Sequence, residues 1–367
     1  MRALARIDSG AIERNTARLA RAADGAAVCA VVKSGGYGHG AVAAARAALA
    51  GGATWLAVAA AAEARELRAA GIDTRLLVMG ALDPEELAVA LDADADVVTW
   101  SEELLAVLPA DARVHVKLDT GMGRLGTRDP ALANRLAESA GDRLAGLMTH
   151  FATADERGDS FMDEQLAHFR GWAEPLRARF PDAVVHAANS AATLRDTATH
   201  FDMVRPGVAI YGLDPFGEDP SAQELEPALE LVTKVLAIKD AAPGESAGYG
   251  RRFVAHEPTQ LATLPIGYGD GWRRALTNNA EVLIGGRRFA LVGTVSMDNI
   301  TVDVGLGGGV QVGDEAVLIG AQGAERILAE EVARRLDTIN YEVTCALTAR
   351  VVRQYPRDRF ADSGGRP

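Results

Sequence analysis

Lys33 stands directly after the apolar run Val28–Val32 and directly before the glycine-rich segment 34–40. An apolar run of this length bounded by glycines predicts a buried strand followed by a loop. A lysine at the tip of such a strand can hold its amine in a desolvated pocket, where it loses its proton more readily and acts as a nucleophile or a base. The alternative is a lysine that merely extends its ammonium group into solvent.

The scarcity of lysine favours the chemical role. Of the 38 basic residues only four are lysines, namely Lys33, Lys117, Lys234 and Lys239. A lysine used only as surface charge is replaceable by arginine in such a chain. A lysine that forms a Schiff base is not, because a guanidinium stays protonated and is a poor nucleophile. We therefore treat Lys33 and Lys117 as candidate functional residues.

Eight short apolar runs alternate with helical stretches between residues 28 and 210. The runs are Val28–Val32, Trp55–Val58, Leu76–Met79, Asp96–Thr99, Val114–Leu118, Leu144–Met148, Val184–Ala187 and Met203–Val204. Eight strand–helix units of this length predict a closed, eight-stranded parallel β/α barrel. An open doubly wound sheet is the alternative, but no G-x-G-x-x-G fingerprint follows the first strand.

The sequence changes character after Tyr211, and β-branched residues and glycine turns become frequent from Leu229. The expected elements are antiparallel strands at Glu281–Val295 and Val310–Gly320 and a late helix at Ala324–Leu336. We therefore predict a barrel domain at residues 1–225 and a mostly β C-terminal domain at residues 226–367. The first few residues can join the β domain.

The active site of such a barrel lies at the carboxyl ends of its strands. The polar residues found there are Lys33, Tyr37, Lys117, Arg124, His150, Asn189, Ser190 and Arg205. Loops after the last two strands commonly build a phosphate site, and Ser190, Gly207 and Val208 can offer hydroxyl and N–H groups to it. Ordinary helix capping would also explain Ser190. A phosphate site beside a Schiff-base lysine predicts pyridoxal phosphate, whose aldehyde needs an amine and whose phosphate needs an anchor.

Bulk properties exclude several classes of partner. The net charge of −12 argues against binding to nucleic acid. The charged, helix-patterned start at residues 1–20 is not a signal peptide, and no uncharged apolar stretch is long enough to span a bilayer. Cys29 and Cys345 are too few for a disulfide framework, and neither they nor the histidines have metal-ligand spacing. We expect a cytoplasmic protein without a metal.

The chain resembles the alanine racemase family of barrel-type pyridoxal phosphate enzymes from Ala30 to Val351. One segment that carries the resemblance runs from Val32 through Lys33 to Gly40, and another from His115 to Gly126. The other matching segments are 149–155, 188–190, 204–207, 248–250, 267–271, 296–298 and 339–342. So many motifs in one order are highly specific.

This resemblance implies a reaction and its two principal residues. Family members interconvert L-alanine and D-alanine with pyridoxal phosphate and supply D-alanine for cell-wall peptidoglycan. Lys33 would bind the cofactor covalently and act as one acid/base, and Tyr249 from the other subunit of a homodimer would act as the second. Racemisation takes a proton from one face of the α-carbon and delivers one to the other, so two bases on opposite faces are the direct solution.

The resemblance also implies binding roles. The cofactor-binding set is Lys33, Tyr37, His150, Asn189, Ser190, Arg205, Gly207, Val208 and Tyr341, and the substrate-binding set is Arg124, Met297 and Asp298. Arg205 would contact the pyridine nitrogen, where a permanently charged guanidinium weakens the ring as an electron sink. Lys117 matches a lysine that is often carbamylated in the family and orients the arginine matching Arg124. We also expect His186 to support the loop at Asn189.

Three residues, Gly35, Thr294 and Ser296, depart from common family patterns and leave the fine shape of the pocket open. Specificity for alanine, for serine or for a broader set of amino acids stays open too, because one hydroxyl or methylene in a small pocket changes binding only modestly. The alternative from another class is a pyridoxal phosphate-binding protein without turnover. The β domain and its Tyr249 disfavour that alternative.

Overall fold

The computed structural model describes residues 2–356, which form two compact units. The barrel unit comprises residues 12–216 and 221–226. The β unit comprises residues 2–11, 217–220 and 227–356. No helix within the described range is long and apolar enough to cross a membrane.

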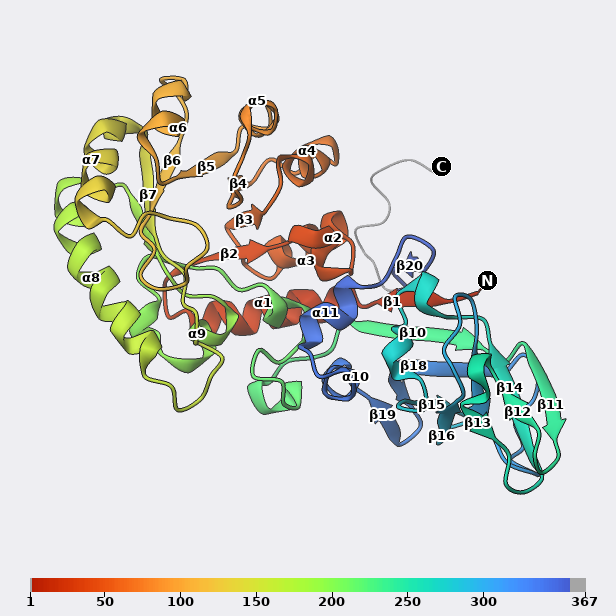
Figure 1. Ribbon diagram of the computed structural model, residues 1–367. Helices are drawn as coiled ribbons and strands as arrows, with labels where there is room; N and C mark the ends of the chain where they lie inside the picture. Colours follow the sequence, from red (N-terminus) through yellow and green to blue (C-terminus); the bar gives the residue numbers. More distant parts are fainter. Residues whose placement is uncertain (1, 357–367) are drawn as a thin grey trace. The chain divides into compact units, whose positions relative to one another are not determined.

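The barrel unit contains the closed parallel barrel that the alternation of apolar runs predicted (Figure 1). Its strands are β2 (Ala27–Val31), β3 (Trp55–Val58), β4 (Arg75–Val78), β5 (Asp96–Thr99), β6 (Val114–Lys117), β7 (Leu144–Met148), β8 (Val184–His186) and β9 (Met203–Val204). Each strand pairs in parallel with the next, and β9 pairs with β2 to close the ring. All carboxyl ends therefore meet at one face, which we call the barrel mouth.

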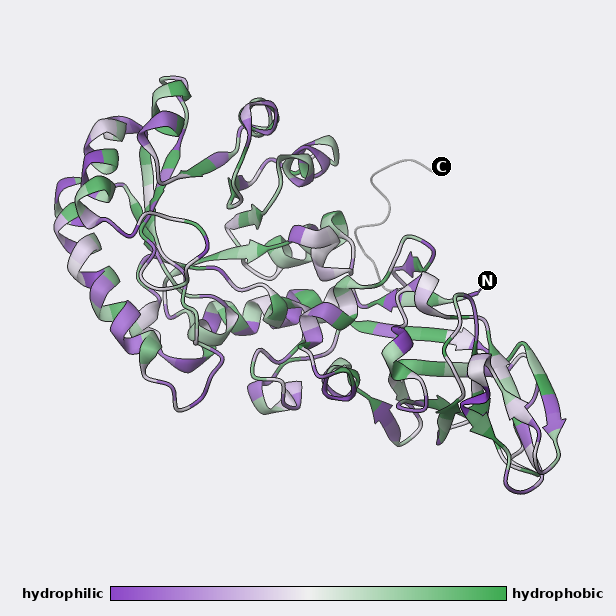
Figure 2. Ribbon diagram, in the orientation of Figure 1, coloured by the Kyte–Doolittle hydropathy of each residue, from purple (hydrophilic) through white to green (hydrophobic). Residues whose placement is uncertain are grey.

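One helix precedes the first barrel strand, and the others lie between successive barrel strands. They are α1 (Ser9–Ala22), α2 (Lys33–Tyr37), α3 (Ala41–Ala50), α4 (Ala61–Ala69), α5 (Pro84–Asp92), α6 (Glu102–Val107), α7 (Pro130–Ala140), α8 (Phe161–Arg179) and α9 (Ser190–Arg195). Side-chain caps fix several starts: Asp83 accepts from the N–H of Glu86, and Ser101 accepts from the N–H of Leu104. Most barrel strands are hydrophobic, whereas α7 and α8 carry both kinds of residue (Figure 2).

The β unit is built around a sheet in the order β11-β14-β17-β16-β15-β18-β10-β1-β20, with β19 paired to β18. The strands are β1 (Leu4–Ile7), β10 (Leu229–Lys234), β11 (Ala237–Ala241), β14 (Thr259–Leu264), β15 (Glu281–Ile284), β16 (Arg287–Val292), β17 (Ile300–Asp303), β18 (Glu315–Gln322), β19 (Glu325–Ile327) and β20 (Val352–Gln354). A separate ribbon pairs β12 (Ser246–Ala247) with β13 (Phe253–Val254), and the helices are α10 (Ala329–Leu336) and α11 (Asn340–Cys345). The mostly β C-terminal part is thus confirmed.

Local expectations in this unit were partly wrong. The late helix begins at Ala329, because Glu325–Ile327 forms β19, which turns back on β18 at Gly323, where φ is +65°. The stretch 281–295 is a hairpin whose turn uses Gly285 and Gly286. The helical pattern at the chain start begins only at Ser9, since Leu4–Ile7 pairs with β10 as a strand. Local pattern cannot anticipate pairing partners that lie far along the chain.

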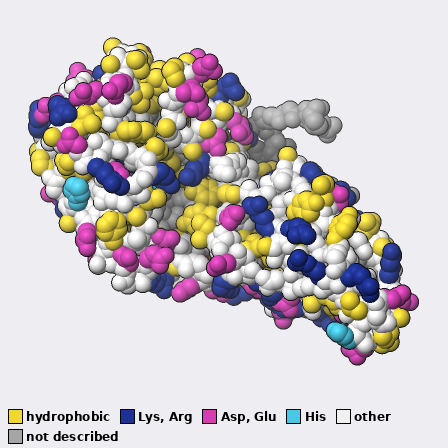
Figure 3. All heavy atoms as spheres, viewed as in Figure 1, with side chains coloured by type: hydrophobic (Ala, Val, Ile, Leu, Met, Phe, Trp, Pro, Cys, Tyr) yellow, Lys and Arg dark blue, Asp and Glu magenta, His cyan; other side chains and the backbone are white. Residues whose placement is uncertain are grey.

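Charged side chains of both signs lie over the surfaces of both units (Figure 3). Because charges of both signs are mixed, the electrostatic potential at the surface stays modest despite the net charge of −12. Among the described residues, charged side chains are buried in both units, for example Asp96, Lys117 and Arg205 in the barrel unit and Asp270 and Glu330 in the β unit. Lys117 and Arg205 belong to the candidate site.

Candidate active site at the barrel mouth

A left-handed turn presents Lys33 at the tip of β2. The φ angles of Ser34, Gly35, Gly36 and Tyr37 are 55°, 59°, 63° and 52°. The N–H of Gly36 donates to the carbonyl of Val32 at 2.9 Å, which closes the turn. Left-handed backbone costs an L-residue about 1–2 kcal/mol, so Ser34 and Tyr37 carry strain that glycine at the two middle positions avoids. Strain of this kind gathers at functional sites.

Glu63 of α4 holds this turn in place, a role that sequence reasoning missed. Its Oε1 accepts from the N–H of Ser34 at 2.5 Å, and its Oε2 accepts from the N–H groups of Ala59 at 3.0 Å and Ala60 at 3.1 Å. One carboxylate therefore joins the tips of β2 and β3. The sequence signal for this role is the position of Glu63. It stands three residues after Ala60, the N-cap residue of α4, where a glutamate commonly accepts from backbone N–H groups.

Cationic side chains converge at the barrel mouth. Lys117 is buried, and burial together with Arg205 and Arg124 lowers the pKa of its amine to about 8. Lys33 adds to the same repulsion. Burial and these cations also hold the pKa of His150 well below its usual range, so its imidazole is neutral at pH 7. A set of cations that mutually repel is suited to an anionic ligand.

A small cradle lies beside these cations. The hydroxyl of Ser190 accepts from the N–H of Gly207 at 2.9 Å and from that of Ala209 at 3.3 Å, which leaves its proton to donate. A Cβ on Gly207 would collide with the phenol group of Tyr37. The Gly207 N–H is thus used within the protein, a difference from its expected role as a free donor. Val208 begins a buried 3₁₀ turn, Val208–Tyr211.

The side chains of Asn189 and His186 both form hydrogen bonds within the barrel unit. The side chain of Asn189 caps α9 by accepting from the N–H of Ala192 at 3.0 Å. His186 was expected to support this loop, but its ring nitrogens bond elsewhere, one to Arg205 at 2.8 Å and the other to His115 at 2.8 Å. Side-chain direction in a strand depends on register, which a local pattern does not specify.

Arg205 is the most deeply buried cation of the site. Its Nη2 donates to the carbonyls of Thr149 at 2.8 Å and Ala187 at 2.9 Å and approaches Nδ1 of His150 at 3.3 Å. Burial lowers the pKa of Arg205 to about 10, which still leaves the guanidinium charged at neutral pH. Its hydrogen-bond partners are neutral, so its positive charge stays available to a ligand.

Three of the remaining candidates lie in neighbouring loops of the β unit. Tyr249 is 75% exposed, and its carbonyl accepts from the hydroxyl of Thr294 at 2.6 Å. Met297 is 51% exposed, and its carbonyl accepts from the N–H of Gly269 at 2.9 Å. The Asp298 carboxylate pairs with Arg350 at 2.7 Å. The exposure of two large side chains, Tyr249 and Met297, marks a surface suited to contact with another molecule.

Tyr341, the last candidate, lies on α11 of the β unit, where its carbonyl accepts from the hydroxyl of Thr344 at 3.4 Å. Among residues 2–356, no group of three or more His, Cys, Asp or Glu side chains is arranged to hold a metal ion.

Comparison with known proteins gives this geometry a family. Residues 7–215 match the family model described as "Alanine racemase, N-terminal domain", and residues 228–355 match "Alanine racemase, C-terminal domain". An alanine racemase of Symbiobacterium thermophilum is 41% identical over 363 residues, which cover 96% of each chain.

Solved structures agree along nearly the whole length. The alanine racemase of a D-cycloserine-producing Streptomyces lavendulae aligns with a TM-score of 0.91 and 37% identity over 97% of each chain. That of Bartonella henselae, solved with covalently bound pyridoxal phosphate, aligns with a TM-score of 0.86 and 29% identity over 97% of this chain and 99% of its own. With its barrel, its β unit and its ordered motifs, the chain belongs to the alanine racemase family.

Proposed function

We propose that the protein is a pyridoxal phosphate-dependent alanine racemase that interconverts L-alanine and D-alanine. The observation that carries the proposal is the convergence of Lys33, Lys117, Arg124 and Arg205 at the barrel mouth. Family membership supplies the substrate and the cofactor. Supply of D-alanine to cell-wall synthesis and a cytoplasmic location are part of the proposal, supported by the family and by the small number of cysteines.

The residues at the mouth fit the cofactor. Lys33 is half-buried, and its amine is of a type that can hold an aldehyde covalently. The Ser190 hydroxyl, with Tyr37 against Gly207, forms a small polar cradle suited to a phosphate group. Asn189 shapes this cradle by capping α9. Val208 and Tyr341 would complete the contacts to the phosphate. When bound, pyridoxal phosphate supplies an electron sink that makes the α-proton of the amino acid acidic.

Two residues move the proton. The Nζ of Lys33 and the phenolic oxygen of Tyr249 exchange a proton with the α-carbon from opposite faces. Arg205 would hold its charge near the ring nitrogen, and neutral His150 would lie against the ring. Because the hydrogen-bond partners of Arg205 among residues 2–356 are neutral, its full charge would oppose protonation of that nitrogen.

Other residues orient the substrate. Arg124 binds the substrate carboxylate through charge-assisted hydrogen bonds. A carbamate on Lys117 would orient Arg124, and Met297 and Asp298 would limit the size of the substrate. We propose that Tyr249, Met297 and Asp298 reach the site from the second subunit of a homodimer. The high exposure of Tyr249 and Met297 supports this arrangement. We also propose two domains, a barrel domain at residues 1–225, whose first few residues join the β domain, and a β domain at residues 226–367.

Racemisation of a panel of L-amino acids by the purified protein tests the function. We expect L-alanine to be turned over fastest, with serine next. No turnover of any amino acid by protein that retains the cofactor would favour a non-catalytic binding protein instead.

Borohydride reduction followed by peptide mapping tests the covalent link. The reduced cofactor should be found on Lys33, because this half-buried residue follows β2 at the barrel mouth. An adduct on Lys117, Lys234 or Lys239 would overturn the assignment. A Lys33→Ala variant should show no adduct at all.

A further inference from the structure

Four buried side chains form a hydrogen-bonded series across the barrel interior, from β5 to the residue after β9. The Nε2 atom of His115 lies 3.1 Å from Oδ2 of Asp96, and its Nδ1 lies 2.8 Å from Nε2 of His186. The Nδ1 of His186 lies 2.8 Å from Nη1 of Arg205. Asp96, His115 and His186 are fully buried, and Arg205 is 3% exposed. We call this series the Asp96–Arg205 relay.

Only one assignment of hydrogens to the four ring nitrogens satisfies every bond of the relay. A guanidinium N–H only donates, so Nδ1 of His186 must accept and its Nε2 must carry the hydrogen. Nδ1 of His115 must then accept from His186, and Nε2 of His115 must donate to the Asp96 carboxylate. A protonated His115 would place two hydrogens between the rings at 2.8 Å, so both imidazoles are neutral.

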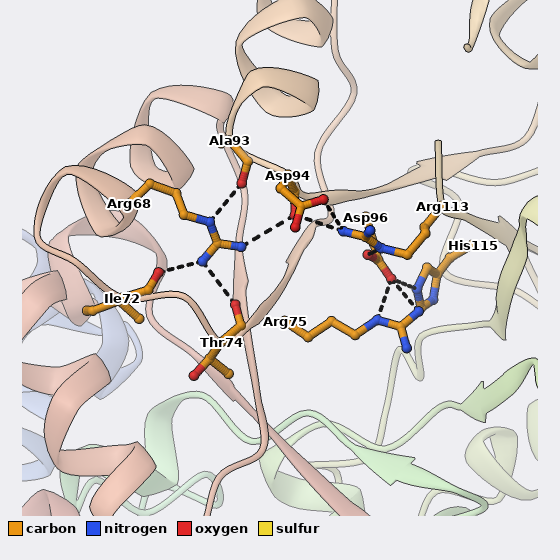
Figure 4. Close-up of polar contacts among 9 residues, drawn as sticks. All are labelled: Arg68, Ile72, Thr74, Arg75, Ala93, Asp94, Asp96, Arg113 and His115. Atoms are coloured by element: carbon orange, nitrogen blue, oxygen red, sulfur yellow. Dashed lines mark hydrogen bonds and ion pairs between the residues drawn. The ribbon is translucent and has the colours of Figure 1, made fainter. Parts of the chain in front are cut away.

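Asp96 is held as a carboxylate at its end of the relay (Figure 4). Burial alone would raise the pKa of Asp96, but the hydrogen bond from His115 and the guanidinium groups of Arg113 and Arg75 hold it well below its usual range. Oδ1 accepts from Nε of Arg113 at 2.5 Å, and Oδ2 lies 3.0 Å from Nη2 of Arg75. The acceptor that the relay needs is therefore always present near neutral pH.

A glycine in the neighbouring strand, β7, leaves room for the His115 ring. Gly146 of β7 lies opposite His115 in the ladder. A Cβ at Gly146 would collide with the His115 ring at Nδ1, the atom that accepts from His186. The ring of Trp55 packs edge-on against the same imidazole, with centroids 5.8 Å apart. The His115 ring thus has one position, set by packing as well as by its hydrogen bonds.

We propose that Asp96 is a positioning residue for the reaction: through His115 it fixes the tautomer of His186, whose Nδ1 lone pair then holds the Arg205 guanidinium in place. The catalytic consequence rests on the proposed function, in which Arg205 faces the cofactor ring. A direct carboxylate partner would neutralise Arg205. A neutral imidazole orients the guanidinium and leaves its positive charge to act on the ligand. The relay thus positions Arg205 without neutralising it.

Neutron diffraction from crystals of the deuterium-exchanged holoenzyme tests the relay without any variant. We expect deuterium on Nε2 and not on Nδ1 of both His115 and His186. Deuterium on Nδ1 of either ring would overturn the proposal. This measurement does not depend on turnover. A protein that failed to racemise alanine would refute the proposed function, whereas the deuterium positions alone would decide whether the relay exists.

The variant Asp96→Asn tests the consequence for Arg205. An asparagine amide can present its NH₂ group to His115, which reverses both tautomers and turns a hydrogen on Nδ1 of His186 toward Arg205. We expect roughly a 10- to 100-fold loss of kcat, by analogy with the loss of an outer partner of a metal-ligating histidine, with a much smaller change in KM. The visible absorption band of the bound cofactor should also shift, because the charge near its ring moves.

Arg75→Gln is the matched control, since it removes an ion pair to Asp96 and leaves the carboxylate that accepts from His115. It should keep the band position and kcat within about twofold. Gly146→Ala, which displaces the His115 ring without changing any charge, should reproduce the Asp96→Asn band shift. A folded Asp96→Asn protein with wild-type band and kcat would overturn the proposal, as would an Arg75→Gln protein equally impaired.

Discussion

At the residue scale, Lys117 lies in surroundings that disfavour its protonated amine. Burial is the largest cause, and the nearby guanidinium groups of Arg205 and Arg124 add repulsion. With a pKa of about 8, the neutral fraction rises as pH increases through that value, and the neutral amine is the form that reacts with carbon dioxide. The product is an anion, which would turn repulsion from two arginines into attraction.

We therefore expect Lys117 to be carbamylated. Protein equilibrated with ¹³C-labelled carbon dioxide should give a carbamate resonance whose occupancy rises between pH 7 and 9 at constant dissolved carbon dioxide. The resonance should be absent in Lys117→Ala, whose lost activity small carboxylates should partly restore by pairing with Arg124. A high-resolution structure with a bare amine and a separate anion such as chloride beside Arg124 would contradict this expectation.

At the element scale, the left-handed turn that carries Lys33 depends on its two central glycines. A Cβ on Gly35 would meet no heavy atom within 4 Å, whereas a Cβ on Gly36 would lie 3.2 Å from the Ala41 N atom and 3.2 Å from the Ala44 Cβ. Both positions have φ near +60°, so they share the conformational cost and differ only in packing.

Gly36→Ala should therefore destabilise the protein more than Gly35→Ala. The shared left-handed cost is about 1–2 kcal/mol. The close contacts at residue 36 add roughly 1–3 kcal/mol, the usual cost of overpacking. Gly36→Ala should also weaken cofactor binding, because the turn positions Lys33 and Tyr37. Thermal unfolding and titration with pyridoxal phosphate measure the two effects. Equal midpoint temperatures of thermal unfolding for the two variants would show that residue 36 has room for a methyl group, which would contradict this prediction.

At the scale of the whole molecule, the proposed acid/base pair is divided between the two units of the chain. Lys33 belongs to the barrel unit and Tyr249 to the β unit, where 75% of its surface is exposed. A tyrosine this exposed has no packing reason to be there. Its exposure is explained if it enters the barrel mouth of a second copy, which gives two shared sites in a symmetric dimer.

Mixing inactive Lys33→Ala and Tyr249→Phe proteins should restore activity if sites are shared. Each hybrid dimer contains one site with both wild-type residues. With random exchange of equal amounts, about a quarter of the wild-type activity should return. Each variant alone, taken through the same exchange, is the control. Demonstrated subunit exchange without recovery would refute shared sites, and sites confined to one chain would then have to be considered.

Sequence alone determined the barrel, the mostly β unit and the strand tip that carries Lys33. These features depend on local periodicity and on glycine boundaries, which a chain displays whatever its tertiary contacts. The sequence also marked Ser190, Arg205 and Gly207, because residues after barrel strands share one face. Their catalytic and binding roles stay predictions.

Tertiary structure decided the contacts among distant strands. Asp96, His115 and His186 are polar residues inside apolar strands, and nothing local shows that they bond to one another and to Arg205. Their pairing depends on barrel closure and on register, which set the side chains that meet inside the barrel. Strand pairing also explains why the helix expected from residue 324 starts later, because residues 325–327 pair with β18 as strand β19. Strand pairing of this kind is a property of the whole fold, and only the folded chain displays it.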